Sequence, residues 1–226
     1  VNANNEWPYS GGGIAGFGTE ATIARCIIKD NTAQRHGGGM SGVNGMINGC
    51  RIFGNSAFLH GGGLVGCHGK ITNCLVYDNC ASGFGGGMMQ CDRDIINCTI
   101  ADNTALEGGG LSHCDGAISN CVIWGNDFEQ LAYSSNPTYS CIQDFYGGRG
   151  NIYTEPGFVN AAGADYQLRF DSVCIDAGTN GPVVGESFPP AADIDGNARP
   201  FDGNNDGAAI TDMGAYEVSP PEAPFM

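Results

Sequence analysis

A repeat of about 24 residues is the feature that most limits what this chain can fold into. Each repeat contains three consecutive glycines, and the triplets begin at Gly11, Gly37, Gly61, Gly85 and Gly108. Two more columns keep the same step, Cys26, Cys50, Cys74, Cys98 and Cys121, and Asn31, Asn55, Asn79, Asn103 and Asn126. A fixed period of this length is typical of solenoids, in which every repeat forms one layer of a stack.

Composition agrees with a turn-rich, packed fold. The chain of 226 residues contains 38 glycines, and 15% of its residues are charged. This combination excludes coiled coils and helical bundles, and a hydrophobic content of 42% is too high for a disordered chain. The glycines also lack the strict every-third spacing of collagen.

Two solenoids fit the repeat. The strand half, Ile47-x-x-Cys50-x-Ile52-x-x-Asn55, is close to that of a leucine-rich repeat. The other half is not, because a leucine-rich repeat usually returns through a helix or 3₁₀ turn, and each glycine in a helix costs about 1 kcal/mol. We therefore predict an all-β fold, a right-handed parallel β-helix of about five regular coils with an irregular C-terminal cap.

Strand alternation predicts which side chains face the interior. Cys50 and Ile52 point inward and the residue between them points outward, as in the equivalent positions one coil away. A second cysteine column, Cys67, Cys91 and Cys114, is expected to line another inner face. The asparagine column is expected at sharp turns, with left-handed backbone angles and amide side chains that bond one another along the axis.

The repeat [Ile/Val]-x-x-Asn-x-Ala followed by Gly-Gly-Gly-[Ile/Leu/Met] resembles the repeats of polymorphic outer-membrane-type proteins and related bacterial surface β-helix proteins, over about residues 11–126. A second resemblance follows residue 155, where Asp193-Ile-Asp-Gly196, Arg199-Pro200 and Asp212-Met-Gly-Ala-Tyr-Glu217 are similar to the closing segment of secreted bacterial β-helix proteins. These resemblances imply a pectin-lyase-like chain that is secreted or on the cell surface, with a cap over the open core.

The domain organisation predicted from these signals has four parts. Residues 1–126 form the coils, 127–154 a last irregular coil or exit loop, 155–218 the C-terminal capping module and 219–226 a Pro-rich tail. Val1 to Ser10 shows no comparable cap, so we expect either a fragment or a first coil that accepts the strand of another chain. The chain does not begin with Met, which also suggests a processed chain or a fragment.

Charge excludes some partners. Nine basic and 24 acidic residues give a net charge of −15, and no basic stripe exists, so nucleic acid is not expected as a partner. No apolar run approaches the roughly 18 residues of a membrane span. Cations are favoured, and self-association, end to end or lateral, and surface glycans are the expected interactions.

One segment predicts calcium binding. Asp202, Asn204 and Asp206 stand at positions 1, 3 and 5 of a loop with glycine at position 6, as at the start of an EF-hand-like site. Asp212 falls at position 11 rather than 12, and a plain turn is the alternative. Asp193 and Asp195 are candidate additional ligands.

Other titratable groups receive structural interpretations. Asp78 and Asp102 are expected one coil apart on the outside, where paired carboxylates can hydrolyse glycosidic bonds. The same column contains Asp30, Gly54 and Gly125, which favours a turn position. His36 and His60 occupy equivalent positions before the glycines, where stacking is one interpretation, but Phe84 and Glu107 continue that column. Without a third ligand they do not indicate zinc, and we favour chance exposed histidines, as for His68 and His113.

The 11 cysteines are not expected to form a disulfide framework. Stacked equivalents have Cβ atoms about 4.8 Å apart, more than a disulfide usually allows. We interpret the ladder cysteines as buried apolar thiols, and Cys80, Cys141 and Cys174, outside the ladders, as the candidates for pairing.

These observations predict a non-catalytic extracellular structural protein that self-assembles into a fibre or surface layer or acts in adhesion. Lys29, Lys70 and the seven arginines form no cluster at matching coil positions, as a β-helix lyase would require. The alternative is a carbohydrate-active β-helix enzyme, a polysaccharide lyase or glycoside hydrolase, or a glycan-binding domain, acting through outward residues such as Asp92, Arg93 and Asp94. A third hypothesis is an adhesin fragment that is inert alone.

Overall fold

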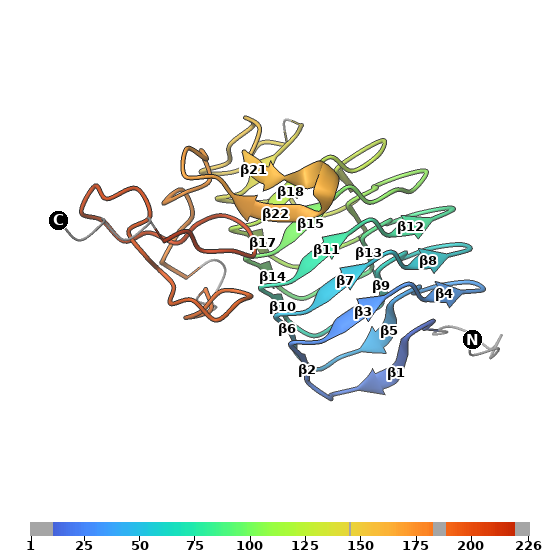
Figure 1. Cartoon of the computed structure of the whole chain (residues 1–226). Helices are drawn as coiled ribbons and strands as arrows, with labels where there is room; N and C mark the ends of the chain where they lie inside the picture. Colours follow the sequence, from blue (N-terminus) through green and yellow to red (C-terminus); the bar gives the residue numbers. More distant parts are fainter. Residues whose placement is uncertain (1–10, 145, 183–188, 220–226) are drawn as a thin grey trace.

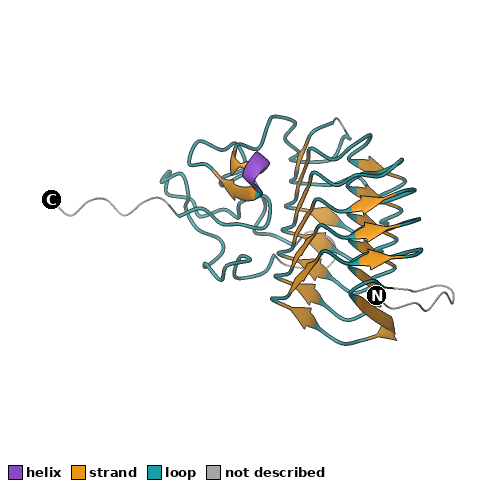
Figure 2. Ribbon diagram, turned by 45° about the vertical axis from the view of Figure 1, so that its right-hand side comes forward, coloured by secondary structure: helices purple, strands orange, loops and turns teal. Residues whose placement is uncertain are grey.

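The computed structural model describes residues 11–144, 146–182 and 189–219, and within them the chain is a parallel β-solenoid of about five turns (Figures 1 and 2). The predicted all-β, parallel β-helix class is confirmed. Helical structure in this part of the chain is confined to one 3₁₀ turn, η1 (Ala161–Gly163), and no helix there is long and apolar enough to cross a membrane. Val1 to Ser10, with its predicted role in assembly, and the tail beyond residue 219 lie outside the described residues.

Short strands stack into four parallel sheets, each with one strand per coil. Sheet A contains β1 (Ile14–Thr19), β5 (Met40–Val43), β9 (Leu64–Val65), β13 (Met88–Met89), β16 (Leu111–Ser112) and β19 (Leu131–Ala132). Sheet B contains β2 (Ile23–Ala24), β6 (Ile47–Asn48), β10 (Ile71–Thr72), β14 (Ile95–Ile96) and β17 (Ile118–Ser119). Sheet C contains β3 (Ile27–Lys29), β7 (Arg51–Phe53), β11 (Leu75–Tyr77), β15 (Thr99–Ala101), β18 (Val122–Trp124) and β20 (Cys141–Ile142). Sheet D contains β4 (Thr32–Ala33), β8 (Ser56–Ala57) and β12 (Cys80–Ala81).

The sequence period sets the register of these sheets. Ile71 pairs with Ile47 on one side and with Ile95 on the other, so each residue lies over its equivalent one repeat away. The interior is one continuous apolar cluster in which the predicted inward residues, Cys50 and Ile52 among them, are fully buried. The second cysteine column, Cys67, Cys91 and Cys114, belongs to the same cluster and is confirmed. The first column is confirmed except at Cys26, which is exposed, so the prediction that every ladder cysteine is buried is wrong there.

Left-handed backbone angles occur one residue before the asparagine column rather than in it. Asp30, Gly54, Asp78, Asp102 and Gly125 all have positive φ, whereas none of the five stacked asparagines does. The prediction that these asparagines take left-handed angles is therefore wrong, and the favoured turn interpretation of the aspartate column is correct. The left-handed turn is therefore made by the residue before each asparagine, while the asparagine itself forms the hydrogen bonds between coils.

The glycine triplets allow coils to stack closely. The first glycine of the third triplet, Gly61, has a φ of +65°, and a Cβ on the next one, Gly62, would collide with the carbonyl of Gly86 in the following coil. Larger residues would force the coils apart at this corner.

The C-terminal module lies along the side of the coils (Figures 1 and 2). It contains the antiparallel pair β21 (Phe158–Asn160) and β22 (Asp165–Leu168), joined by η1, followed by irregular chain. Its Tyr166, Ile194 and Ala215 pack on Leu75 and Tyr77, residues on the outer face of sheet C. Among the described hydrophobic residues after β20, Tyr146, from the irregular last coil, packs against the interior cluster. The prediction that residues 155–218 cap the open core stays a prediction.

Candidate functional site

The asparagine column forms a continuous buried hydrogen-bond ladder, as predicted. Asn55 Oδ1 accepts from the backbone N–H of Asn31 at 3.1 Å and from its side-chain Nδ2 at 2.9 Å. The same pair of bonds recurs from Asn55 to Asn79, from Asn79 to Asn103 and from Asn103 to Asn126. Gln130 ends the ladder by accepting from Asn126 at 3.2 and 2.8 Å. These five amides satisfy backbone groups of the fold and leave nothing free for a ligand.

The cysteines are free thiols. Nine of the 11 are buried, while Cys26 and Cys80 are exposed. Burial and hydrogen bonds to Cys121 and Cys74 raise the pKa of the Cys98 thiol, so it stays protonated. Cys141 and Cys174, two of the candidates for pairing, are unpaired neighbours in a cluster between the module and sheet C. The ladder cysteines therefore act as small apolar side chains.

The candidate calcium loop closes on its own backbone. Asp202 accepts from the N–H groups of Asp206 at 3.1 Å and Gly207 at 2.9 Å, and Asn204 Oδ1 accepts from Asp206 at 2.9 Å. Asp212 is directed elsewhere, since its carboxylate accepts from the backbone of Asp176 and Val218 at 2.8 and 2.7 Å. Within the described part of the chain, no three His, Cys, Asp or Glu side chains gather as metal ligands. Calcium at Asp202, Asn204 and Asp206 stays a prediction.

The two additional candidates, Asp193 and Asp195, serve the module and its attachment. Asp193 accepts hydrogen bonds from the backbone of Asp195, Asn197 and Glu217. Asp195 forms an ion pair with Arg51 of β7 at 2.6 Å, and thus joins the module to the second coil.

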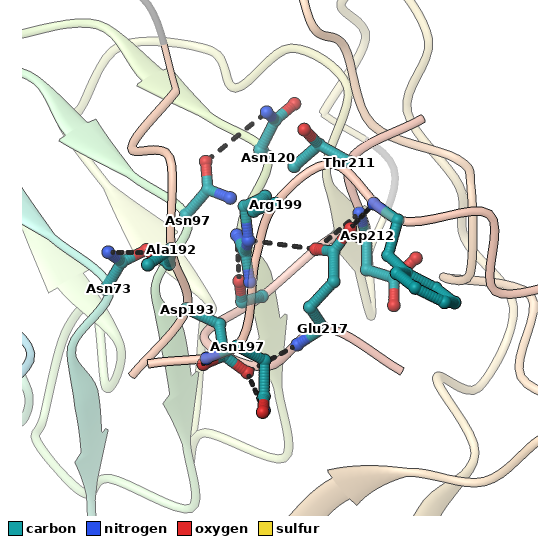
Figure 3. A network of polar contacts seen from close by, with 12 residues as sticks. Asn73, Asn97, Asn120, Ala192, Asp193, Asn197, Arg199, Thr211, Asp212 and Glu217 are labelled. Atoms are coloured by element: carbon teal, nitrogen blue, oxygen red, sulfur yellow. Dashed lines mark hydrogen bonds and ion pairs between the residues drawn. The ribbon is translucent and has the colours of Figure 1, made fainter. Parts of the chain in front are cut away.

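A buried ionic network lies where the module meets the solenoid (Figure 3). Arg199 Nε is 2.9 Å from Glu217 Oε2, and neither side chain is exposed to solvent. Arg199 Nη1 also donates to the carbonyl of Gly214 at 3.1 Å. Burial raises the pKa of Glu217 to about 7 against the opposing effect of Arg199, and it raises the pKa of Asp212 to about 6. This network joins the segment around Arg199 to residues 212–217 of the module.

Polar side chains of the coils fasten the same module (Figure 3). Asn73 Nδ2 donates to the carbonyl of Ala192 at 2.7 Å, and Asn120 exchanges two hydrogen bonds with the backbone of Thr179 at 2.9 and 3.0 Å. Tyr166 donates to Asp102 Oδ2 at 2.7 Å. One of the two carboxylates considered for glycosidic hydrolysis is thus bound to a tyrosine of the module, while burial and nearby Asp102 raise the pKa of Asp78.

His36 and His60 form a stack, so the favoured interpretation of chance exposed histidines is wrong for these two residues and the stacking alternative is correct. The rings of His36 and His60 stack with centroids 5.2 Å apart, and Phe84, His113 and Tyr133 extend the column. The backbone N–H of Phe84 donates to His60 Nδ1 at 3.1 Å, which requires that nitrogen to be unprotonated. Burial lowers the pKa of both His36 and His60. These are half-buried side chains in a stack rather than isolated surface histidines.

The outer turn between sheets A and B carries a polar hollow of about 470 Å³. Side chains from four successive coils line it: Glu20, Asn44, His68, Lys70, Arg93 and Asp94, with Gly69 between His68 and Lys70. Asp94 Oδ2 is 3.8 Å from Lys70 Nζ, and Asp92 Oδ2 is 3.2 Å from His68 Nδ1. We call this feature the polar hollow.

The sequence predicts part of this hollow, because Asp92, Arg93 and Asp94 are expected to face outward. The sequence does not predict that Glu20, Asn44 and Lys70 lie beside them. Lys70 and Arg93 do meet in the hollow, although they stand at different positions of adjacent coils. The signal was in the repeat, since one step of 24 residues places His68 over Asp92 and Lys70 over Asp94.

Stacked parallel sheets, an internal amide ladder and an outer hollow define a β-solenoid protein with a lateral module. In the comparisons with known proteins, no family model matches the chain, and no curated protein and no solved structure is significantly similar to it.

Proposed function

We propose that this chain is a non-catalytic extracellular structural module, a rigid β-helix that self-assembles into a fibre or surface layer or acts in adhesion. The observation that carries the proposal is the continuous asparagine ladder, which bonds every coil from Asn31 to Gln130 into one rod. The resemblance of the repeats to pectin-lyase-like bacterial surface proteins supports the same class and a secreted or cell-surface location.

The ends of the sheets support self-association. Within the described residues, β1, β2, β3 and β4 each pair with a strand on one side alone, at the N-terminal end of the stack. Edge strands of this kind accept strands of another chain. End-to-end stacking of solenoids would pair these edge strands with strands of a second chain.

Electron microscopy of the native protein near neutral pH, with and without calcium, tests the proposal. Ordered filaments or sheets support assembly, and binding of the purified protein to cell surfaces supports adhesion. Dispersed particles that bind no cells contradict both. In a parallel polysaccharide screen, depolymerisation or tight binding of a glycan would establish the alternative, a carbohydrate-active enzyme or glycan-binding domain.

A further inference from the structure

The polar hollow has hydrogen-bond acceptors at one end. Glu20 follows β1 in the first described coil, and its exposed carboxylate forms no ion pair with a described residue. Asn44 stands at the next position up the stack, after β5, and its Nδ2 donates to the carbonyl of Gly18 at 3.3 Å. Asn44 Oδ1 is buried and accepts no hydrogen bond from the described residues. A buried acceptor without a donor is unfavourable, so this end favours a ligand that donates.

The other end of the hollow contains one cationic side chain without an ion-pair partner among the described residues. Lys70 lies beside the carboxylate of Asp94, which balances its charge, and the ring of His68 lies beside the carboxylate of Asp92. Arg93 is exposed, lines the hollow and forms no ion pair with any described residue. A guanidinium binds a carboxylate through two parallel hydrogen bonds, so this end favours an anionic group.

The repeat fixes the distance between the two ends. Glu20 belongs to the first described coil and Arg93 to the fourth, so three steps of about 4.8 Å place them roughly 14 Å apart along the axis. An extended peptide rises about 3.4 Å per residue, so about four residues span this distance. A volume of about 470 Å³ lies within the usual range for ligand sites.

We propose that the polar hollow binds a short extended peptide of about four residues, with its ammonium group at Glu20 and Asn44 and its carboxylate at Arg93. No bond is made or broken, so the site is a recognition site. The inference goes beyond the proposed scaffold function and does not depend on it, because it rests on side chains of the outer turn alone.

Isothermal titration with tetraglycine tests the site. The peptide with both termini free is expected to bind, while N-acetylated tetraglycine, C-amidated tetraglycine and diglycine are each expected to bind at least tenfold more weakly. The acetyl form lacks the ammonium group, the amide form lacks the carboxylate, and the dipeptide is too short to reach both ends.

Two variants test which end of the hollow binds each terminus of the peptide. Glu20→Gln is expected to bind tetraglycine no more tightly than N-acetylated tetraglycine, and its affinity for the acetylated peptide should equal that of the unmodified protein. Arg93→Gln is expected to bind tetraglycine no more tightly than C-amidated tetraglycine, and its affinity for the amidated peptide should likewise be unchanged. This non-additivity identifies a direct contact. Arg25→Gln and Glu129→Gln remove exposed charges outside the hollow and are expected to leave all affinities unchanged. Circular dichroism melting confirms that the variants fold.

Three results would overturn the proposal. The first is no binding of tetraglycine at about 10 mM, well above the millimolar affinity of a weak ligand. The second is equal binding of the free and capped peptides. The third is glucuronate binding that depends on Arg93 but not on Glu20, which would assign the hollow to an acidic sugar.

Discussion

The coils and the C-terminal module pair buried polar side chains with different chemistry. The coils use neutral amides, Asn55, Asn79, Asn103 and Asn126, each stacked on its own copy. The module uses opposite charges, with Arg199 against Glu217. A residue stacked on its copy must be both donor and acceptor, as an amide is, because like charges about 4.8 Å apart repel. A repeat therefore selects self-complementary groups, whereas a segment that occurs once can use unlike partners.

The largest effect is expected from removing one charge of the buried pair. Arg199→Met leaves Glu217 buried without its partner, which costs about 3–5 kcal/mol in the free energy of unfolding. Urea denaturation at pH 7.5 measures it. The exposed ion pair of Arg169 with Asp171 gives the control, since Arg169→Met is expected to cost less than about 1 kcal/mol.

A double variant separates lost charge from lost packing. Adding Glu217→Gln to Arg199→Met removes the unpaired carboxylate and keeps an acceptor oxygen for one of the two backbone N–H groups, those of Phe201 and Asp212, that donate to Glu217. Part of the stability is expected to return. If the double variant is less stable than Arg199→Met, the network contributes through packing, and the contrast with the coils is wrong.

One rung of the amide ladder is expected to matter less than the buried charge. Asn79→Ala removes an acceptor for Asn55 and a donor for the carbonyls of Ile52 and Tyr77. Leaving such groups unsatisfied costs about 1–3 kcal/mol. Urea denaturation checks this, with Asn136→Ala at an exposed position as the control. A cost as large as that of Arg199→Met would remove the distinction between the two regions.

The fold was predictable because its information is periodic. A step of about 24 residues places Cys50, Cys74 and Cys98 in one inward column, whatever the details of the turns. The C-terminal module occurs once in the chain, so the repeat does not predict where it packs. A signal was nevertheless present, since Leu75 and Val122 are apolar at positions predicted to face outward, and the module buries both.

The polar hollow could also be predicted only in part, because it combines residues that the repeat does not align. Asp92, Arg93 and Asp94 are neighbours in sequence, whereas Glu20 and Asn44 come 73 and 49 residues before Arg93. The alignment of Glu20 with Asn44 depends on an irregularity within β1, whose register with β5 shifts between Ala15 and Thr19. Composition and spacing do not specify such a shift.

The two regions are expected to respond to pH in opposite directions. His36 and His60 have lowered pKa values in the fold, so the coils lose stability as the pH falls below about 6.5. Arg35 also lowers the pKa of His36, and His113 also lowers the pKa of His60, because a nearby positive charge opposes protonation. Glu217 has its pKa raised from 4.5 to about 7, so the module is most stable below pH 4.5 and loses stability as the pH rises through 7.

Unfolding by urea at pH 5.5 and 7.5 measures these responses in single variants. Relative to the unmodified protein, His60→Phe is expected to be less sensitive to the lower pH, and Glu217→Gln less sensitive to the higher pH. His68→Phe, at a histidine outside the stack, is the control for the first variant. Identical pH dependence in all four proteins would show that neither region titrates as its burial implies.

Calcium is expected to have the smallest effect, and in the module alone. If Asp202, Asn204 and Asp206 bind the ion, calcium at a concentration equal to its Kd adds about 0.4 kcal/mol to the free energy of unfolding, and a chelator reverses the gain. Differential scanning calorimetry with and without calcium measures the shift, and Asp206→Asn is expected to abolish it. Asp115→Asn, an exposed carboxylate on the coils, is the matched control. A shift that survives in Asp206→Asn places the ion elsewhere, while no shift at millimolar calcium leaves the loop as a turn closed by its own backbone bonds. In that case the loop oxygens are bound by the module's own backbone N–H groups, and the contrast between the regions rests on Arg199 and Glu217.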